Sequence, residues 1–246
     1  MSLLPDLLTT LPSRDQIQND EGTHGYLLID KPLGKTAFHL VAVLRKRLRV
    51  KKIGHAGTLD PLATGVMVML IGRYTKLSDQ FLSQRKEYIA TVHLGIQTDS
   101  YDGEGKVIAT NPLVPTEAEV RTALNQFQGD VLQVPPMFSA KKVNGQKLYD
   151  LARQGKEIER APVSVNMNID FLEYNYPTIK LRVDCAKGTY IRSLAYDLGK
   201  VLGCGAYLSG LIRTKSGSFA LESCITPDQL YDDNVNLKSF LQVISH

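Results

Sequence analysis

One carboxylate stands in a loop directly before a long apolar run in the segment GHAGTLDPLATGVMVML, residues 54–70. Pro61 fixes its own φ and biases Asp60 away from the helical region, while the glycines of the segment permit turns that other residues resist. The apolar run at residues 66–71 is long enough for a buried strand and too short to span a membrane. The segment therefore predicts an acid fixed at the edge of a buried strand, which is a candidate reaction centre. The alternative is that Asp60 and Pro61 only open a turn.

Composition and charge distribution narrow the class of protein. The chain has 246 residues, of which 43% are hydrophobic and 22% charged, as in ordinary globular proteins. Its net charge of +4 is a weak argument for nucleic-acid binding, but the charges are clustered. Seven basic residues and no acidic one lie between Lys35 and Lys52, and six basic residues lie among three acids from Lys141 to Arg160. Such clusters are typical of surfaces that contact phosphates. The alternative is a solvated helix face. The absence of any acid in the first cluster favours RNA binding.

Several other features of the sequence argue against disulfides, metal sites, a signal peptide and a membrane span. Cys185, Cys204 and Cys224 lack C-x-x-C spacing, so we expect reduced thiols and neither a disulfide framework nor a zinc site. The acidic loop at residues 98–105 lacks the spacing of a calcium loop and is interpreted as a turn-rich connection. The N-terminus does not resemble a signal peptide, and no segment reaches the length of a membrane span. We therefore expect a cytoplasmic protein without metal or cofactor.

Apolar patterns predict the main elements. Strands are expected at residues 26–30, 66–71, 88–94 and 178–183, and helices after Thr36, from Thr116 through Phe127, around residues 147–154 and at residues 190–202. The helical spacing predicts two apolar faces, formed by Phe38, Val41, Leu44 and Leu48 and by Leu194, Leu198 and Val201. Because strands and helices do not alternate regularly, the fold class expected is α+β, a mixed, largely antiparallel central sheet with flanking helices.

The chain is expected to divide into three parts. Residues 1–22 are interpreted as a flexible N-terminal arm, residues 23–225 as the catalytic domain, and residues 226–246 as a short C-terminal tail. The tail is too short to form a further folded domain.

Five further blocks occur in order along the chain: GYLLIDKPLGKTAFHLV, KEYIATVHLGIQTDSYDGEG, PPMFSAKKVNGQKLYDLARQG, CAKGTYIRSLAYDLG and GCGAYLSGLIRTKSGSF. Together with GHAGTLDPLATGV, they resemble the pseudouridine synthase family, and in detail the bacterial enzymes that convert a uridine in the T arm of tRNA. The resemblance covers roughly residues 25 to 220. It implies a central curved sheet crossed by an RNA-binding cleft, and an insertion near residues 141–155 that grips the RNA arm. The PUA domain that follows in many relatives is not evident here.

The resemblance also implies a catalytic pair. Isomerising uridine breaks the C1′–N1 bond, turns the uracil and reattaches it through C5, without net redox change and without a cofactor. A carboxylate stabilises a sugar carbon that becomes positive, as in glycosidases. Asp60 matches the catalytic aspartate of the family. Arg192 matches the arginine that pairs with this aspartate, and its guanidinium suits a carboxylate.

Five other residues match positions that bind the substrate in the family. Tyr88 and Tyr190 match the tyrosines that line the uracil pocket, where stacking would hold a flipped base. Leu211 matches an apolar residue that borders the same pocket. His55 is expected to hold the extruded nucleotides rather than to act as a general base, and Lys31 to support the cleft or contact phosphate. For the tyrosines and Leu211, packing in the core is the alternative.

The function predicted is isomerisation of uridine to pseudouridine at position 55 in the T loop of tRNA, by a monomer that needs no guide RNA. The alternative is a non-catalytic module that binds or folds RNA. A glycoside hydrolase would need a second positioned acid, and Asp99, Asp102 and Glu104 show no evident link to Asp60. A guide-dependent enzyme would usually carry the extra C-terminal domain.

Overall fold

The structure is a computed structural model that describes residues 22–139, 141–143, 145–156 and 158–244. Two compact units divide the chain, the first within residues 1–86 and 212–246 and the second at Glu87–Leu211. The predicted N-terminal arm lies outside the described residues except for Gly22, and the division into arm, catalytic domain and tail stays a prediction. Within the described ranges, no helix has the length and apolar character needed to cross a membrane.

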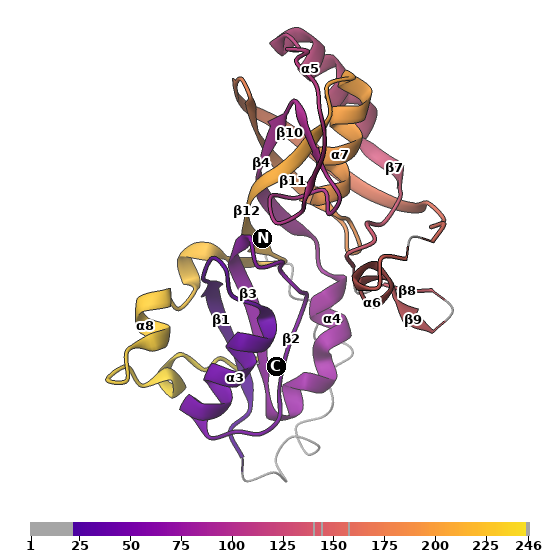
Figure 1. The fold of residues 1–246 in the computed structure, drawn as a ribbon. Helices are drawn as coiled ribbons and strands as arrows, with labels where there is room; N and C mark the ends of the chain where they lie inside the picture. Colours follow the sequence, from indigo (N-terminus) through magenta and orange to yellow (C-terminus); the bar gives the residue numbers. More distant parts are fainter. Residues whose placement is uncertain (1–21, 140, 144, 157, 245–246) are drawn as a thin grey trace. The chain divides into compact units, whose positions relative to one another are not determined.

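The first unit is built on strand β3 (Ala63–Ile71) (Figure 1). The residues of this strand are buried along almost its whole length. Strand β1 (Gly25–Lys31) pairs with β3 in antiparallel orientation, and β2 (Ile53–His55) pairs antiparallel with its last residues. These ladders confirm the strands predicted at residues 26–30 and 66–71. They also place the connection between β2 and β3, residues 56–62, at the start of β3.

Helix α3 (Ala37–Leu48) follows β1 in the first unit. The Thr36 hydroxyl accepts a hydrogen bond of 3.1 Å from the His39 N–H, which confirms Thr36 as the N-cap. The expected apolar face was wrong at Phe38, which is 73% exposed. Because each helical residue turns by about 100°, Phe38 lies well away from the centre of the buried stripe formed by Ala37, Leu40, Val41, Leu44 and Leu48.

The rest of the first unit consists of short elements: η1 (Gly72–Leu77), α4 (Ser78–Ser83), β13 (Phe219–Ala220), η3 (Leu221–Ser223), α8 (Pro227–Tyr231) and η4 (Leu237–Phe240). Leu230 and Leu237 are buried, so the C-terminal segment packs into this unit. Arg47 of the first basic cluster donates hydrogen bonds of 2.6–2.8 Å to carbonyl oxygens near α8. It therefore anchors this segment instead of offering a free cation to a phosphate.

The second unit contains four strands in the order β4 (Lys86–Leu94), β11 (Thr178–Cys185), β10 (Val163–Asn175) and β7 (Gly129–Gln133). The β11–β10 and β10–β7 pairs are antiparallel. Strand β12 (Ala206–Ser216) borders β4 and belongs to this unit as far as Leu211. In β4, Ala90, Val92 and Leu94 are buried while Thr91 and His93 between them are half-buried, which confirms the predicted strand. The α+β class with a mostly antiparallel central sheet is also confirmed.

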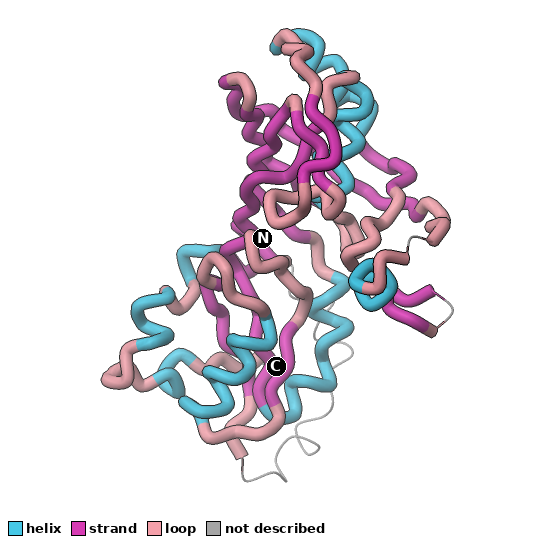
Figure 2. The backbone as a smooth tube through the Cα atoms, in the orientation of Figure 1, coloured by secondary structure: helices cyan, strands magenta, loops and turns pink. Residues whose placement is uncertain are grey.

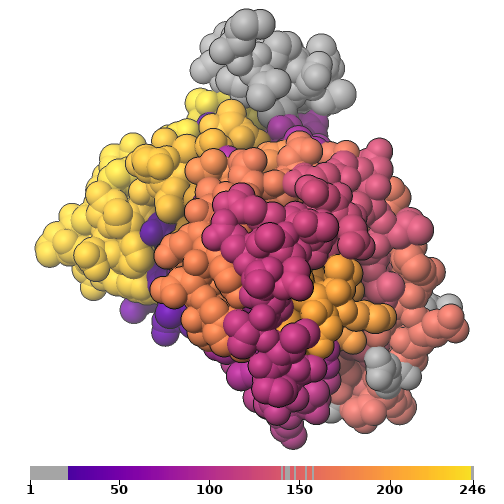
Figure 3. All heavy atoms as spheres, turned by 90° about the horizontal axis from the view of Figure 1, so that it is seen from above, coloured from indigo at the N-terminus to yellow at the C-terminus, as the bar shows by residue number. Residues whose placement is uncertain are grey.

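Two helices pack together in the second unit, α5 (Glu117–Leu124) and α7 (Ile191–Leu202) (Figures 2 and 3). Helix α5 begins with the capping box predicted at Thr116 and continues into η2 (Asn125–Phe127). Leu194 and Leu198 of α7 are buried as expected, but Val201 is 45% exposed, which corrects that prediction. Val201 lies roughly 100° from the centre of the buried stripe, at its edge in the last turn.

Smaller elements complete the second unit: the β5 (Ile96–Thr98) and β6 (Val107–Thr110) pair, the β8 (Lys142–Val143) and β9 (Gln146–Lys147) pair, and α6 (Leu148–Arg153). Helix α6 confirms the helical stretch predicted around residues 147–154. The turns between β5 and β6 carry the acidic loop at residues 98–105.

Candidate active site

Asp60 lies in the connection between β2 and β3, and hydrogen bonds fix this connection on both sides. The Asp60 carbonyl accepts a bond of 3.0 Å from the Ala63 N–H, and the Pro61 carbonyl accepts one of 2.8 Å from the Gly34 N–H. Gly57 adopts a φ of 99°, which glycine tolerates and other residues resist. The backbone around the carboxylate is therefore well defined, as expected from its glycines and proline.

Lys31, at the end of β1, is fully buried beside this connection. Its ammonium group donates hydrogen bonds to the carbonyl oxygens of Lys35 at 2.5 Å, Pro32 at 3.0 Å and Pro61 at 3.4 Å. Of the two roles expected for Lys31, this geometry supports a structural one, because a phosphate contact would require the ammonium to leave these carbonyls.

Arg213, in β12, binds the other side of the same connection and is 1% exposed. Its Nε donates a hydrogen bond of 2.6 Å to the Val66 carbonyl, and one terminal nitrogen lies 3.3 Å from the Gly57 carbonyl. This arginine was not predicted from the sequence. The only signal was its place in the block GCGAYLSGLIRTKSGSF, because carbonyl partners leave no pattern in the side chains. Two buried cations thus bind carbonyl groups on either side of Asp60.

His55 ends β2, five residues before Asp60. Burial lowers the pKa of its imidazole, and the positive charge of Arg213 lowers it further. Its Nδ1 is buried and has no hydrogen-bond partner among the residues that the structure describes. The imidazole is therefore kept neutral at neutral pH, with one ring nitrogen available for a hydrogen bond.

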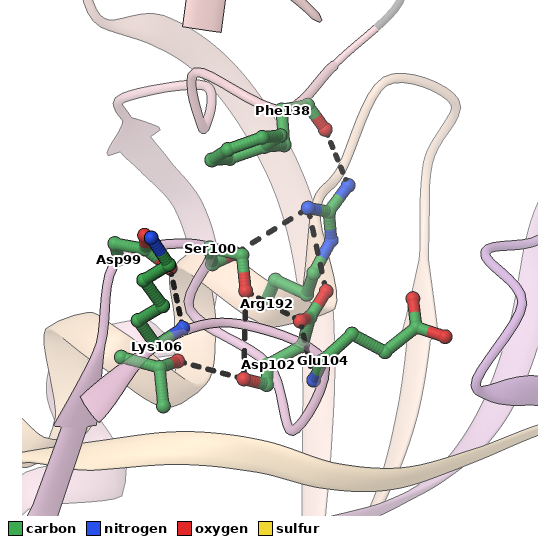
Figure 4. A network of polar contacts seen from close by, with 8 residues as sticks. Asp99, Ser100, Asp102, Glu104, Lys106, Phe138 and Arg192 are labelled. Carbon is green, nitrogen blue, oxygen red and sulfur yellow. Dashed lines mark hydrogen bonds and ion pairs between the residues drawn. The ribbon is translucent and has the colours of Figure 1, made fainter. Parts of the chain in front are cut away.

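The second unit contains Arg192, in the first turn of α7, as the centre of a buried polar network (Figure 4). One terminal nitrogen lies 3.5 Å from a carboxylate oxygen of Asp102, and both side chains are almost fully buried. The guanidinium also donates to the carbonyls of Phe138 at 2.8 Å and Ser100 at 3.4 Å. Arg192 therefore has a buried carboxylate partner within its own unit, and its predicted pairing with Asp60 stays a prediction.

Asp102 is held by short-range hydrogen bonds within the acidic loop. Its carboxylate accepts bonds from the Ser100 hydroxyl at 2.5 Å and the Glu104 N–H at 3.1 Å, and its carbonyl accepts one from the Thr98 hydroxyl at 2.7 Å. Tyr101 adopts a φ of 67°, an uncommon conformation for a residue with a side chain. The loop interpretation of residues 98–105 was right, but its role in holding the partner of Arg192 was missed.

Tyr190 immediately precedes α7 and is fixed by the side chain of Gln133, the last residue of β7. The Gln133 amide accepts a hydrogen bond of 2.8 Å from the Tyr190 N–H and donates one of 3.0 Å to the Tyr190 carbonyl. The Ser193 hydroxyl donates a bond of 2.8 Å to the Val134 carbonyl. The end of β7 and the residues after it therefore position the start of α7.

The two remaining candidates lie on neighbouring strands of the second unit. Tyr88 is half-buried on β4, and Leu211 is 8% exposed on β12. Each is buried enough to pack in the core, and its role in binding stays a prediction.

The described parts of the chain contain no group of three or more histidine, cysteine, aspartate or glutamate side chains arranged to hold a metal ion. Among the residues that the structure describes, none of the three cysteines forms a disulfide, and Cys185 and Cys204 are buried.

Comparison with known proteins gives a consistent result. The model of the TruB family pseudouridylate synthase N-terminal domain matches residues 45–191, and that of the tRNA pseudouridylate synthase B C-terminal domain matches residues 192–243. The tRNA pseudouridine synthase B of Protochlamydia amoebophila is 61% identical over 208 residues, which are 84% of this chain and 79% of that protein. The protein of the same name from Chlamydia trachomatis serovar L2 is 53% identical over 223 residues, 90% of this chain and 92% of that protein.

A solved structure agrees with the sequence relatives. The crystal structure of a Cbf5–Nop10–Gar1 complex contains a chain that matches with a TM-score of 0.68 at 30% identity. The match covers 89% of this chain and 60% of that one. The chain therefore belongs to the TruB family of pseudouridylate synthases.

Proposed function

We propose that this protein isomerises uridine to pseudouridine at position 55 in the T loop of tRNA. The observation that carries the proposal is the match to the family over residues 45–243, a range that includes every proposed site residue except Lys31. The relatives with the highest identities described above are named tRNA pseudouridine synthase B, which supports tRNA as the substrate.

Asp60 is the proposed catalytic residue. Its carboxylate acts on C1′ of the target uridine, as nucleophile or as electrostatic stabiliser, while the C1′–N1 bond breaks. The uracil then turns, C5 bonds to C1′, the proton on C5 is lost and N1 gains a proton, so that the product is an isomer of the substrate. The buried cations Lys31 and Arg213 support this role because they fix the backbone on both sides of Asp60.

The other candidates bind and orient the flipped nucleotide. Tyr88 and Tyr190 stack on the uracil, Leu211 borders it, and Arg192 supports the acid. The fixed backbone of Tyr190 supports its role, because a base that must be released and turned needs a rigid surface.

His55 is proposed to bind the nucleotides displaced with the target base. Its neutral imidazole and its Nδ1 without a partner in the described structure support a hydrogen-bonding role. A buried polar atom that stays without a partner costs free energy, so a ligand that supplies one is favoured.

The proposed partner is the T stem-loop of tRNA, bound by a monomer in the cytoplasm without a guide RNA. The distribution of basic residues supports an RNA partner more than the net charge does.

The test is replacement of Asp60 by Asn, assayed by release of tritium from tRNA labelled at uridine C5, with the modified position mapped afterwards. We expect turnover to fall by a factor on the order of 10³ or more, while RNA affinity changes little, because phosphate contacts dominate binding. The matched control is Asp79→Asn, an exposed acid on α4 of the same unit.

Normal turnover by Asp60→Asn would refute the assignment of the acid. Tight RNA binding by the wild-type protein without any tritium release would instead favour the non-catalytic RNA-binding module.

A further inference from the structure

A concave surface of the first unit gathers positive charge away from the Asp60 connection. It encloses about 430 Å³ and is lined by His24 and five cations: Arg49, Lys51, Lys52, Arg73 and Lys238. We call this surface the basic pocket. No acidic residue lines it, and its five cations exceed the net charge of +4 of the whole chain.

The backbone beneath the basic pocket is tightly packed. The Lys52 carbonyl accepts a hydrogen bond of 2.8 Å from the Gly72 N–H, which joins the start of β2 to the start of η1. A Cβ atom on Gly72 would lie 2.2 Å from Nδ1 of His24, so only glycine fits there. The cations therefore project from a fixed surface formed by segments that are distant in sequence.

Most of these cations are available to a ligand. Arg49, Lys51, Lys52 and Lys238 are exposed, and their side chains make no hydrogen bond or ion pair with any residue in the described ranges. Arg47, from the same basic run, is instead bound to carbonyl oxygens. The structure thus separates the run into an anchoring residue and cations that face solvent together.

Arg49 provides a second, independent observation. It ends α3 in the left-handed conformation, with φ of 59° and ψ of 35°. Glycine or asparagine is normal at such a helix end, because a side chain disfavours this conformation. An arginine in this conformation, whose exposed side chain makes no hydrogen bond or ion pair with any described residue, supports a role in binding.

The position of the basic pocket excludes direct contact with the reacting base. The pocket lies at the end of β3 next to Gly72, whereas the Asp60 connection precedes the start of β3 at Ala63. Nine extended residues separate the two ends, which corresponds to about 30 Å. An anion in the pocket would therefore belong to a remote part of the substrate.

We propose that the basic pocket binds backbone phosphates of the tRNA about 30 Å from the target uridine. This inference rests on the proposed function, since it takes the tRNA as substrate, and adds a second binding site to it. The chemistry that recognises the RNA here is a group of uncompensated cations, so the contact is independent of sequence and sensitive to salt.

The test measures binding of full-length tRNA at several salt concentrations, in proteins that also carry Asp60→Asn so that turnover does not intervene. The variant combines Arg49→Gly, Lys51→Gln and Lys52→Gln. If each cation neutralises one phosphate, the slope of log K against log salt falls by roughly 2 to 3, and affinity at 0.1 M salt falls roughly 100-fold. With Asp60 intact, turnover at saturating tRNA is expected to be unchanged.

The matched control removes three cations that are already paired with acids in the second unit, by Arg121→Gln, Lys180→Gln and Arg182→Gln. It changes the net charge equally and is expected to leave the slope unchanged. The single variant Arg49→Gly separates binding from folding, because glycine adopts this backbone conformation readily. We expect its thermal midpoint to be equal or higher and its affinity to be roughly fivefold lower.

An unchanged salt slope in the triple variant, or an equal loss in the matched control, would overturn the proposal. So would a loss of turnover at saturating tRNA with the slope intact. If the wild-type protein binds tRNA with the expected slope but converts no uridine, the proposed function fails while the binding site stands.

Discussion

Both units bury cations next to residues proposed for function, but they compensate the charge differently. In the first unit, the described contacts of Arg213 are carbonyl oxygens and a thioether, and Lys31 also binds carbonyls. In the second unit, Arg192 is paired with the carboxylate of Asp102, which is itself held by hydrogen bonds.

The difference indicates two kinds of task. A cation bound to carbonyls fixes the course of the backbone, and in the first unit that backbone carries Asp60. A cation bound to a buried carboxylate forms a pair of side chains that can be replaced only together. Either charge alone inside the protein would lower the free energy of unfolding. We therefore expect a substitution in the first arrangement to act through the geometry of the backbone, and one in the second arrangement to act through an uncompensated buried charge.

The largest effect is expected from breaking the charge pair. Arg192→Met should lower the free energy of unfolding by about 3–5 kcal/mol, because it leaves the Asp102 carboxylate buried without its cation. Adding Asp102→Leu removes the orphaned charge and should recover about 1–3 kcal/mol of that loss. Urea denaturation of the single and double variants measures both values. A double variant no more stable than Arg192→Met would show that charge balance is not what the pair provides.

A smaller effect is expected from the cation that binds carbonyls. Arg213→Met should lower the free energy of unfolding by about 1–3 kcal/mol, since it removes charged donors from two carbonyls but leaves no charge behind. Turnover at saturating RNA should fall by up to about 10²-fold, because the Asp60 connection loses a support.

Arg213→Lys sharpens this comparison, because it keeps the charge but replaces the planar fork by a single ammonium group. We expect it to recover only part of the turnover, since a single ammonium replaces a planar fork whose Nε and terminal nitrogen bind two different carbonyls. Full recovery in steady-state assays would mean that charge, and not geometry, is the contribution of Arg213.

The features that sequence predicted are those with local causes. The caps at Thr36 and Thr116 depend on hydrogen bonds within three residues, and the alternation along β4 depends on a period of two. Phe38 and Val201 failed because both are apolar residues at the edge of a helical stripe, where tertiary packing decides burial. Strand β10, the longest in the described chain, was not predicted, since asparagine and aspartate alternate with its buried residues.

The site was predictable where the motif itself contains the acid. The partners of the site residues were not predictable from the sequence. Asp102 and Arg192 are 90 residues apart, and either could have been a surface charge. Gln133 and Arg213 bind backbone atoms, which every residue has, so no complementary residue type marks their partners.

The smallest predicted effect concerns how the free energy of unfolding depends on pH. One group in each unit contributes to this dependence, and the two contributions have opposite signs. Burial raises the pKa of Asp197 on α7 to about 6, so its carboxyl stabilises the fold below about pH 4 and this contribution is lost as pH rises through 6. The pKa of His55 is lowered, mainly by burial, so its contribution is present above its ordinary value near 6.5 and is lost as pH falls.

Two substitutions separate these contributions. Asp197→Asn should be more stable than wild type at pH 7 by on the order of 1 kcal/mol, an amount reduced by its partial exposure, and equal to it near pH 4. His55→Gln should gain stability relative to wild type as the pH falls below 6.5, whatever its offset at pH 7. Urea denaturation at several pH values gives both difference curves, which must slope in opposite directions. The advantage of Asp197→Asn grows with rising pH, whereas that of His55→Gln grows with falling pH because the imidazole of the folded protein resists protonation. A flat curve for His55→Gln would show that this histidine is as free to take up a proton as in the unfolded chain, and the comparison would then be limited to the carboxyl of the second unit.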